Sequence, residues 1–375
     1  MRATMARPHT TLSRRPARAF AAGDVAGQHA QEPPEVADAP AARIAVVIPC
    51  YRVSRQVLGV IGRIGAECWR IYVVDDACPE GSGDLVAARC ADRRVQVIRH
   101  RKNLGVGAAV MSGYRAALSD GAQVIVKIDG DGQMAPELLP GFVAPILDGQ
   151  ADYCKGNRFY ELDHIDRMPI VRKLGNAALS IMAKFSGGYW DIFDPANGYT
   201  AIHASVARRL PFDKISQRYF FETDMLFRLN TFRAVVVDIP MDATYGDETS
   251  SLKVFRIFPE FLYKNLRNGA KRIFYNYFLR DFSIASLELV VGLAMLAFGT
   301  IYGSVHWIWS ARAGVATPPG TVMLAALPVL VGVQLLLAFI GYDIASVPRR
   351  AIHPALARRE QVTLSDPSTS ERDAR

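Results

Sequence analysis

The sequence predicts an α/β domain with a mostly parallel sheet, followed by an amphipathic helix and two transmembrane helices. In the first half of the chain, short apolar runs alternate with segments of helical periodicity, which is the pattern of βαβ units. A segment with apolar residues at helical spacing and basic residues between them comes next. Two apolar stretches follow, and each is long enough for the roughly 20 residues that a bilayer requires.

The predicted strands are short apolar runs that end in polar or turn-forming residues. The first covers residues 44–48 and ends at Pro49, and the others cover residues 71–74, 95–98 and 124–128. Residues 107–118 carry apolar side chains every three to four positions, which predicts a helix. Ligands of parallel sheets bind beyond the carboxyl ends of the strands. The residues that follow the strands, two of the three groups being acidic, are therefore candidates for a site.

The second half of the chain is predicted to meet a membrane. Residues 257–282 read as an amphipathic helix in the membrane interface, with a core helix as the alternative. The spans are predicted over residues 284–308 and 322–342. The loop between them holds one cation, Arg312, whereas both outer flanks are basic. The positive-inside rule then places both termini and the α/β domain in the cytoplasm.

These segments predict five parts. A disordered tail covers residues 1–42, the α/β domain 43–256, the juxtamembrane helix 257–282, the transmembrane hairpin 283–345 and a second disordered tail 346–375. The first tail lacks the apolar core of a secretory signal peptide. The start of this tail, which is rich in Arg and has no acidic residue before Asp24, leaves a transit peptide as an alternative to disorder.

Charge and cysteine content exclude some classes of protein. The net charge is +8, and two basic groups stand out: the arginines before Asp24 in the first tail, and the lysines and arginines between residues 264 and 280, just before the first span. Neither is a stripe on a compact domain, so nucleic acid is not an expected partner. The five cysteines show no Cys-x-x-Cys spacing, which argues against a zinc site or a disulfide framework.

The segment Asp-Gly-Asp at residues 129–131 follows the fourth predicted strand. Two carboxylates one residue apart at that place can reach one hard cation, and oxygen ligands suit Mg²⁺ or Mn²⁺ together with substrate phosphates. Such a cation would offset the charge of a departing nucleoside diphosphate. A simple turn is the alternative, because Asp and Gly favour turns. The position at the end of a parallel strand favours the metal.

Five motifs in order carry a resemblance to a known family. They are Val-Ile-Pro-Cys-Tyr at residues 47–51, Val-Asp-Asp at 74–76, Asn-Leu-Gly-Val-Gly at 103–107, Asp-Gly-Asp at 129–131 and Asp-Pro-Ala-Asn-Gly-Tyr at 194–199. This order resembles a family 2 glycosyltransferase of the GT-A fold. The interface helix and two spans make the chain similar to the polyprenyl-phosphate branch, which includes dolichol-phosphate mannose synthases. The resemblance covers residues 43–345.

The resemblance implies a nucleotide pocket lined by Pro49 and Tyr51, with Asp76 hydrogen-bonded to the base. It also implies a cluster that holds the metal ion and the donor diphosphate. The members of that cluster would be Asp129, Asp131 and, as a further metal contact, Gln133. One departure from the family pattern lies nearby, since Ala77 and Cys78 replace the usual Gly-Ser after the second acidic strand.

The same resemblance implies phosphate-binding cations and a residue beside the sugar. Arg158 and Arg172 would lie near the donor diphosphate or the acceptor phosphate, where a guanidinium can bind in bidentate fashion. Asp194 would lie beside the sugar. The branch often has an Arg-x-x-Gly-x-Ser-Lys segment before its membrane part, but residues 245–253 lack that arginine. Lys253 is then the phosphate contact that remains.

Glu222 and Asp224 are candidates for a catalytic base at a predicted helix start. In many family 2 enzymes an acidic residue here takes a proton from the acceptor hydroxyl, and a buried carboxylate with a raised pKa could do so. A lipid phosphate is already an anion and needs no base. The alternative role for both residues is helix capping and complement to the helix dipole. The sequence leaves these readings open.

The function expected from this resemblance is inverting transfer of a hexose from a UDP- or GDP-sugar to a polyprenyl phosphate. The protein would be integral to the bacterial inner membrane, with the bilayer and the two substrates as partners and a homo-oligomer left open. Transfer to a glycan hydroxyl in surface polysaccharide assembly is the alternative. A membrane scaffold with a degenerate domain is a third reading, against which the intact Asp129 and Asp131 pair argues.

Overall fold

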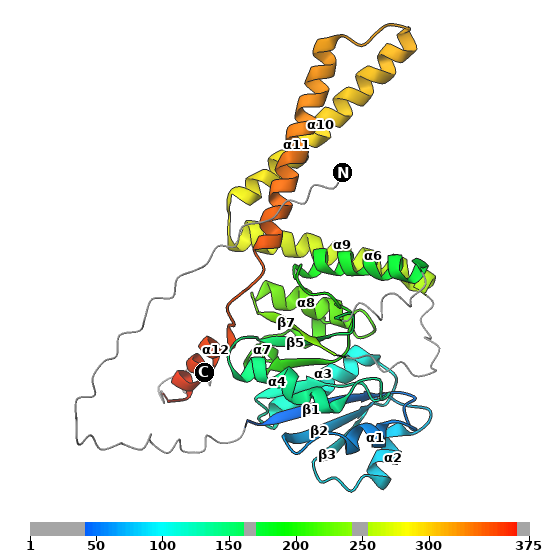
Figure 1. Cartoon of the computed structure of the whole chain (residues 1–375), viewed down its shortest axis with the longest axis vertical. Coiled ribbons are helices and arrows are strands. Elements are labelled where there is room, and N and C mark those ends of the chain that lie inside the picture. Colours follow the sequence, from blue (N-terminus) through cyan, green and yellow to red (C-terminus); the bar gives the residue numbers. More distant parts are fainter. Residues whose placement is uncertain (1–41, 161–169, 242–253, 366–375) are drawn as a thin grey trace, which may run out of the picture. The chain divides into compact units, whose positions relative to one another are not determined.

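The computed structural model describes residues 42–160, 170–241 and 254–365. In this part of the chain a seven-stranded sheet is the frame of the α/β domain (Figure 1). Its order is β3-β2-β1-β4-β6-β5-β7, and neighbours run parallel except at β6, which is antiparallel to both β4 and β5. The strands are β1 (Ile44–Cys50), β2 (Cys68–Asp75), β3 (Val95–Arg99), β4 (Val124–Lys127), β5 (Tyr153–Asn157), β6 (Thr200–His203) and β7 (Val236–Pro240). The predicted mostly parallel sheet is confirmed.

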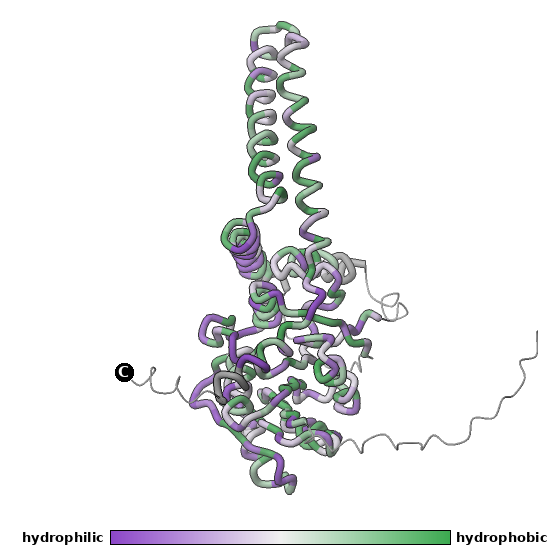
Figure 2. Tube along the Cα trace, turned by 90° about the vertical axis from the view of Figure 1, so that its left-hand side faces the viewer, coloured by the Kyte–Doolittle hydropathy of each residue, from purple (hydrophilic) through white to green (hydrophobic). Residues whose placement is uncertain are grey.

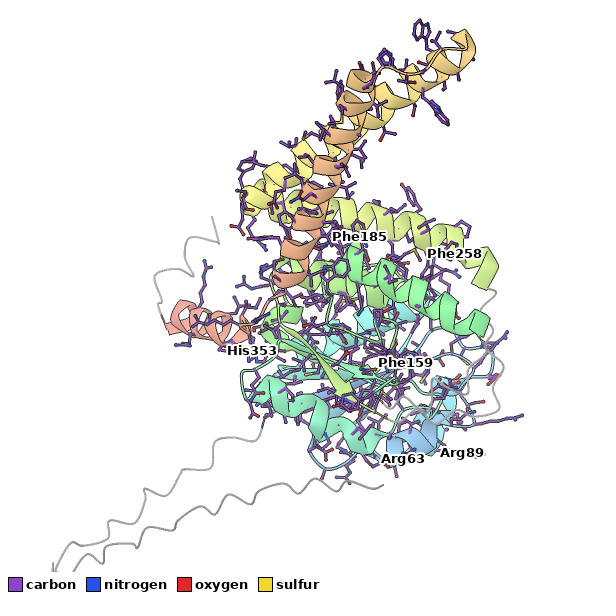
Figure 3. The ribbon with its side chains drawn as sticks, turned by 45° about the horizontal axis from the view of Figure 1, so that its top comes forward. Arg63, Arg89, Phe159, Phe185, Phe258 and His353 are labelled. Atoms are coloured by element: carbon purple, nitrogen blue, oxygen red, sulfur yellow. The ribbon has the colours of Figure 1, made fainter. Side chains whose placement is uncertain are left out.

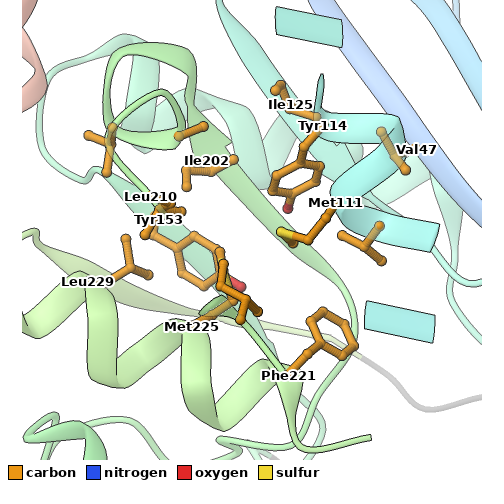
Figure 4. Close-up of a cluster of buried hydrophobic side chains, with 14 of the residues drawn as sticks. Val47, Met111, Tyr114, Ile125, Tyr153, Ile202, Leu210, Phe221, Met225 and Leu229 are labelled. Atoms are coloured by element: carbon orange, nitrogen blue, oxygen red, sulfur yellow. The ribbon is translucent and has the colours of Figure 1, made fainter. Parts of the chain in front are cut away.

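Helices cover both faces of the sheet because its central strands are apolar on both faces. Along β1, Val47 belongs to one buried cluster and Val46 to the other. The first cluster contains α3 (Val106–Ser119), α7 (Ala204–Ala207) and α8 (Phe221–Thr231), and Figure 4 shows part of it. The second contains α1 (Val57–Gly62), α2 (Ser82–Arg89), the 3₁₀ turn η1 (Pro136–Leu138) and α4 (Leu139–Leu147). A further 3₁₀ turn, η2 (Phe212–Lys214), precedes α8. Each fully buried aliphatic side chain stabilises such a core by about 1.5–3 kcal/mol.

The helix before the membrane part presents its polar face to the domain. α9 (Val254–Phe274) packs against α6 (Ile170–Gly187) and α8, and it continues into a π-helical turn, η3 (Tyr275–Arg280). The side chains that α9 buries are polar or charged, namely Asn265, Asn268 and Arg272. Its exposed side chains include large apolar ones, namely Phe258, Tyr263, Leu266 and Phe274. The alternative of an ordinary core helix, which would bury its aromatic side chains, does not fit this arrangement.

Two helices of the described chain are long and apolar enough to cross a membrane, α10 (Ile284–Ala313) and α11 (Pro319–Ala345). They pack against one another, and Figure 2 shows that apolar residues predominate along both. Glycines allow the close approach. A Cβ at Gly299 would lie 2.6 Å from the carbonyl oxygen of Ala325, and one at Gly332 would lie 2.8 Å from the amide nitrogen of Leu296. Both helices contain the spans predicted from the sequence.

The segment after α11 differs from the expected disordered tail. A short helix, α12 (His353–Ser365), begins with His353, which lies against the α/β domain (Figure 3). The buried carboxylate of Asp152 accepts hydrogen bonds from the backbone amides of Ile352 and His353, and its Oδ1 lies 2.9 Å from His353 Nδ1. The His353 ring also stacks on that of His203, with 4.2 Å between centroids. These contacts hold the start of α12 in place.

Candidate active site

The site is built at the carboxyl ends of β1, β2 and β4, which are parallel neighbours. The turn after β4 carries Asp129 and Asp131, and the amide of Gln133 donates a 3.0 Å hydrogen bond to Asp131 Oδ1. A Cβ at Gly130 would lie 3.3–3.4 Å from side chains of β1, so the turn packs closely on that strand. Gly132 has a φ of +79°, which glycine adopts without strain. Two glycines thus fix the path on which both aspartates are presented.

A buried lysine, Lys127, lies beside Asp129. Its ammonium nitrogen is 2.7 Å from Asp129 Oδ1 and 3.9 Å from Glu222 Oε1. Gly198, in the loop before β6, completes the group, because a Cβ there would clash with the Lys127 ammonium and with the Asp129 carboxylate. The end of β4, the start of α8 and the loop before β6 therefore converge on one cation. Sequence reasoning did not single out Lys127.

Glu222 and Lys155 extend this charged cluster. Burial raises the pKa of Glu222 to about 7, although Lys127 and Lys155 oppose the shift. Burial lowers the pKa of Lys155 to about 8, opposed by Glu222 and Asp194. The Lys155 ammonium also donates a hydrogen bond to the backbone carbonyl of Asn197. Groups whose pKa values lie close to neutrality are typical of active sites, because they can exchange protons there.

Asp194 and Arg158 form a bidentate ion pair. Arg158 Nε lies 2.8 Å from Asp194 Oδ2, and Arg158 Nη2 lies 3.2 Å from Asp194 Oδ1. The Asp194 carboxylate is buried, and Asn197 Nδ2 lies 3.4 Å from its Oδ2. The structure therefore brings together two residues to which the resemblance gave separate roles. Their roles toward sugar and phosphate remain predictions.

Asp238, on β7, is a neighbour that sequence reasoning missed. Its Oδ2 accepts hydrogen bonds from the amide of Phe193 at 2.7 Å and from Asn157 Nδ2 at 3.2 Å. Its Oδ1 is buried and has no hydrogen-bond partner within the described ranges. Burial raises the pKa of Asp238 to about 6, against the opposing effect of the Phe193 amide and of Lys155. An acidic residue inside an apolar strand was the available signal.

Asp76, the predicted partner of the base, supports a loop in this structure. Its Oδ1 accepts a 2.8 Å hydrogen bond from the amide of Leu104 and lies 2.7 Å from His100 Nδ1. Its Oδ2 accepts a 2.7 Å hydrogen bond from the amide of Gly105. The Gly105 φ of +101° is one that other residues rarely adopt. Asp76 thus fixes the 103–105 segment, and contact with a base remains a prediction.

The other predicted nucleotide contacts lie at the end of β1. Pro49 pairs with Val74 of β2, one residue before Asp75. Tyr51 is 43% exposed, and the Arg52 guanidinium lies over its ring at 5.4 Å from the centroid. An exposed aromatic face beside the strand ends could stack on a base, so the geometry is compatible with the predicted role.

Asp224 occupies the junction of α8 and α9. Its Oδ2 accepts a 2.9 Å hydrogen bond from the amide of Ser216, and its Oδ1 accepts one of the same length from Asn268 Nδ2 of α9. Arg228 Nη2 is 3.5 Å from Oδ2. Helix capping was the alternative role for Asp224, but within the described chain α8 has no side-chain capping hydrogen bond, and these contacts instead tie α8 to Ser216 and to α9. Glu222, in contrast, lies in the charged cluster.

Two predicted phosphate contacts cannot be placed. Arg172 belongs to α6, but its side chain lies outside the described part of the chain, as does the whole of Lys253.

Asp129 and Asp131 are the groups that could bind a divalent ion. Among the described residues, no group of three or more His, Cys, Asp or Glu side chains could hold a metal by itself. Mg²⁺ and Mn²⁺ are commonly held by one or two carboxylates together with substrate phosphates and water. The chemistry of this turn fits an ion of that kind, shared with a bound diphosphate.

Comparisons with known proteins identify the family. A sequence model of glycosyl transferase family 2 matches residues 45–211. Undecaprenyl-phosphate mannosyltransferase of Micrococcus luteus is 31% identical over 203 residues, which are 53% of this chain and 82% of that protein. Polyprenol monophosphomannose synthase of Mycolicibacterium smegmatis is 29% identical over 210 residues, 55% of this chain and 78% of that protein.

Among solved structures, glucosyl-3-phosphoglycerate synthase from Mycobacterium tuberculosis, in complex with Mn²⁺, UDP and glucosyl-3-phosphoglycerate, has a TM-score of 0.45 and 16% identity. The match covers 62% of this chain and 80% of that one. Because the family model and the relative in Micrococcus luteus both match, the chain belongs to glycosyl transferase family 2 and is a glycosyltransferase.

Proposed function

We propose that this enzyme transfers a hexose from a UDP- or GDP-sugar to a polyprenyl phosphate, with inversion, at the cytoplasmic face of the bacterial inner membrane. The observation that carries the proposal is the orientation of α9, which buries Asn265, Asn268 and Arg272 and exposes large apolar side chains, namely Phe258, Tyr263, Leu266 and Phe274. The two membrane-length helices follow directly. A domain held at a bilayer in this way suits a lipid acceptor. The names of the two relatives support the same acceptor class.

On the donor side, Asp129 and Asp131 would hold Mg²⁺ or Mn²⁺ and the diphosphate, with Gln133 as a further contact. The cation would neutralise the charge that develops on the departing nucleoside diphosphate. Lys127 keeps Asp129 in place through the 2.7 Å ion pair. Because this ammonium is buried, its charge acts with little screening on any group that enters the turn.

On the acceptor side, a phosphate oxygen is the nucleophile and needs no base. It needs cations that hold it in line with the anomeric carbon. We assign this role to Arg158, Arg172 and Lys253; the ion pair of Arg158 with Asp194 supports the choice of Arg158. Asp194 would lie beside the sugar, held by the same guanidinium. On this proposal the Arg158–Asp194 pair would link the two substrates.

A second candidate function, transfer to a glycan hydroxyl, is favoured by Glu222. Burial brings the pKa of this carboxyl to about 7, which suits a general base near neutral pH. A hydroxyl acceptor would need such a base. The pH dependence discussed below separates the two acceptors.

The cytoplasmic orientation rests on charge and on the course of the chain. The last turn of α10 carries Arg312, whereas Lys271, Arg349 and Arg350 flank the hairpin on its other side. His353, after the second span, contacts Asp152 of the domain that precedes the first. A chain that crosses twice and returns to its own domain has both outer flanks on one side. Because both flanks are basic, we propose that this side is the cytoplasm.

The test is a donor screen with the purified full chain in detergent. Labelled UDP- and GDP-hexoses are incubated with polyprenyl phosphate and Mg²⁺ or Mn²⁺, and sugar in the organic phase is counted. The proposal expects one donor to give an extractable product that depends on the lipid and on the cation. Transfer only to a soluble glycan would favour the second function.

A further inference from the structure

Asp343 joins the second membrane helix to the α/β domain through a carboxylate that accepts two hydrogen bonds at each oxygen. Its Oδ1 accepts hydrogen bonds from Arg272 Nη1 and from the Tyr277 hydroxyl, both at 2.6 Å. Its Oδ2 accepts hydrogen bonds from Arg272 Nη2 at 2.9 Å and from Trp190 Nε1 at 2.8 Å. Both oxygens are thus fully used, by groups from three different segments. Such a buried network specifies one arrangement of those segments.

Arg272 of α9 contacts both the second membrane helix and the α/β domain at this network around Asp343, which we call the joint. Its side chain is 2% exposed, and its Nε and Nη2 also donate to the backbone carbonyl of Phe185 in α6. A Cβ at Gly188, whose φ is +71°, would lie 2.8 Å from Arg272 Nη1. The guanidinium therefore fills space that only a glycine leaves open. The start of the 188–199 loop is packed directly on the joint.

Trp190 links Asp343 to the loop that leads to Asp194. Lys184 Nζ of α6 donates a 2.9 Å hydrogen bond to its carbonyl, while its indole donates to Asp343. Three residues later, the amide of Phe193 donates to Asp238. The next residue, Asp194, holds Arg158 through the bidentate pair. The segment that runs from Asp343 to the Asp194–Arg158 pair is therefore held at residues 188, 190, 193 and 194.

We propose that the membrane hairpin is a positioning element of the active site as well as an anchor. Asp343, acting through the Trp190 indole, fixes the loop that presents Asp194. Trp190 and Asp343 are classed as positioning residues because they act on the site through the loop. The inference rests on the proposed function for the role of Asp194 beside the sugar. The link between hairpin and loop stands on the contacts themselves.

The test compares two variants that each remove one hydrogen bond from the same carboxylate. Trp190→Phe keeps an aromatic ring and removes the bond to the loop. Tyr277→Phe removes the bond from η3 and leaves the loop attached. Each full-length variant is measured for thermal midpoint, for affinity toward UDP and GDP, for kcat and for hydrogen exchange of the 188–199 segment. The two should lower the midpoint by similar amounts.

The expected results differ in the loop and in the chemistry. Trp190→Phe should speed exchange of the 188–199 amides several-fold and lower kcat roughly tenfold, because misplacement at a distance from the chemistry is costly there. Its nucleotide affinity should match the wild type. Tyr277→Phe should leave exchange and kcat unchanged. Equal loss of kcat in both variants, or unchanged exchange in Trp190→Phe, would overturn the proposal. If the wild type shows no transfer, the proposed function fails while the exchange comparison still decides the link.

Discussion

The positive charge of Lys127 offsets negative charge of Asp129 and Glu222 in the candidate site before any substrate binds. Its ammonium is buried and lies within 4 Å of carboxylate oxygens on Asp129 and Glu222. An unpaired buried charge is costly, so the three side chains stabilise one another. Asp131 lies at the turn, where its Oδ1 accepts the hydrogen bond from Gln133. Asp131 is therefore the carboxylate whose removal should affect donor chemistry with least effect on the core.

Asp131→Ala is expected to lower donor turnover by about 100-fold or more, because a preorganised charge at the departing diphosphate is lost. Chelation of Mg²⁺ or Mn²⁺ should have a comparable effect on the wild-type enzyme. Asp148→Ala, at the exposed end of α4, is the matched control and should behave as wild type. Initial rates of nucleotide release measure all three. Full turnover of Asp131→Ala in the presence of chelator would contradict the assignment.

Glu222 makes the pH dependence informative. Its pKa of about 7 lies above the usual value, so the carboxylate form appears only as pH rises through that range. A base would give activity that rises with pH through about 7, and Glu222→Gln would then cost about 10²–10⁴-fold. With a phosphate acceptor no base is needed. We therefore expect Glu222→Gln to keep turnover within about tenfold of wild type, with the pH–rate profile unchanged near 7.

Sequence reasoning reached some site residues and missed others for a physical reason. Asp129 and Asp131 could be predicted because they directly follow an apolar strand, where the carboxyl ends of parallel strands gather. Lys127, Lys155 and Asp238 are single charged residues inside short strands. A charged residue inside an apolar strand marks each of these positions, but the partner on another element, such as Glu222 on α8, cannot be identified from the local sequence.

At the scale of elements, the helix pair α8 and α9 shows how a buried acid can organise structure. Asp224 accepts hydrogen bonds from Ser216 before α8 and from Asn268 on α9. It is 1% exposed, so these bonds replace water completely. The junction holds the polar face of α9 on the domain. Periodicity alone predicted an amphipathic helix, and the structure adds that the polar residues face inward.

Asp224→Ala is expected to destabilise the protein by about 1–3 kcal/mol for each donor left unpaired. The thermal midpoint in detergent should fall, while affinity for the nucleoside diphosphate stays as in wild type. Asp213→Ala is the control, since Asp213 is 94% exposed in its ion pair with Arg115. An unchanged midpoint combined with lost turnover would instead make Asp224 a catalytic residue.

The strands after β4 could not be predicted from the sequence. β6 has four residues, Thr200–His203, and runs antiparallel to both of its neighbours. Runs this short carry little periodicity, and their place in the sheet depends on pairing with strands far away in sequence. β1 to β4 were predicted because each is a longer or more apolar run followed by a polar or turn-forming residue.

At the scale of the whole molecule, the chain leaves its domain, passes through the hairpin and returns. Asp152 binds the backbone of Ile352 and His353, which sequence reasoning assigned to a disordered tail. A polar segment without periodicity predicts disorder when its partner is unknown. Here the partner is a buried carboxylate near the start of β5, on the domain before the spans.

This return predicts a testable topology. Val315→Cys, between the spans, should react with a membrane-impermeant thiol reagent in intact cells. Arg358→Cys, on α12, should react only after the cells are permeabilised. Cys50, Cys68 and Cys154 are buried, and wild-type cells serve as the control for the other native thiols. Labelling of both engineered sites from the same side would contradict the two-span arrangement.

The nature of the acceptor is tested by comparing transfer from the labelled donor to polyprenyl phosphate with transfer to polyprenol of equal chain length. The two acceptors share the lipid and differ in the nucleophile. We predict a labelled, organic-extractable product with the phosphate and none with the alcohol, and loss of that product in Asp131→Ala. Equal transfer to polyprenol, or undiminished transfer by the variant, would contradict the account.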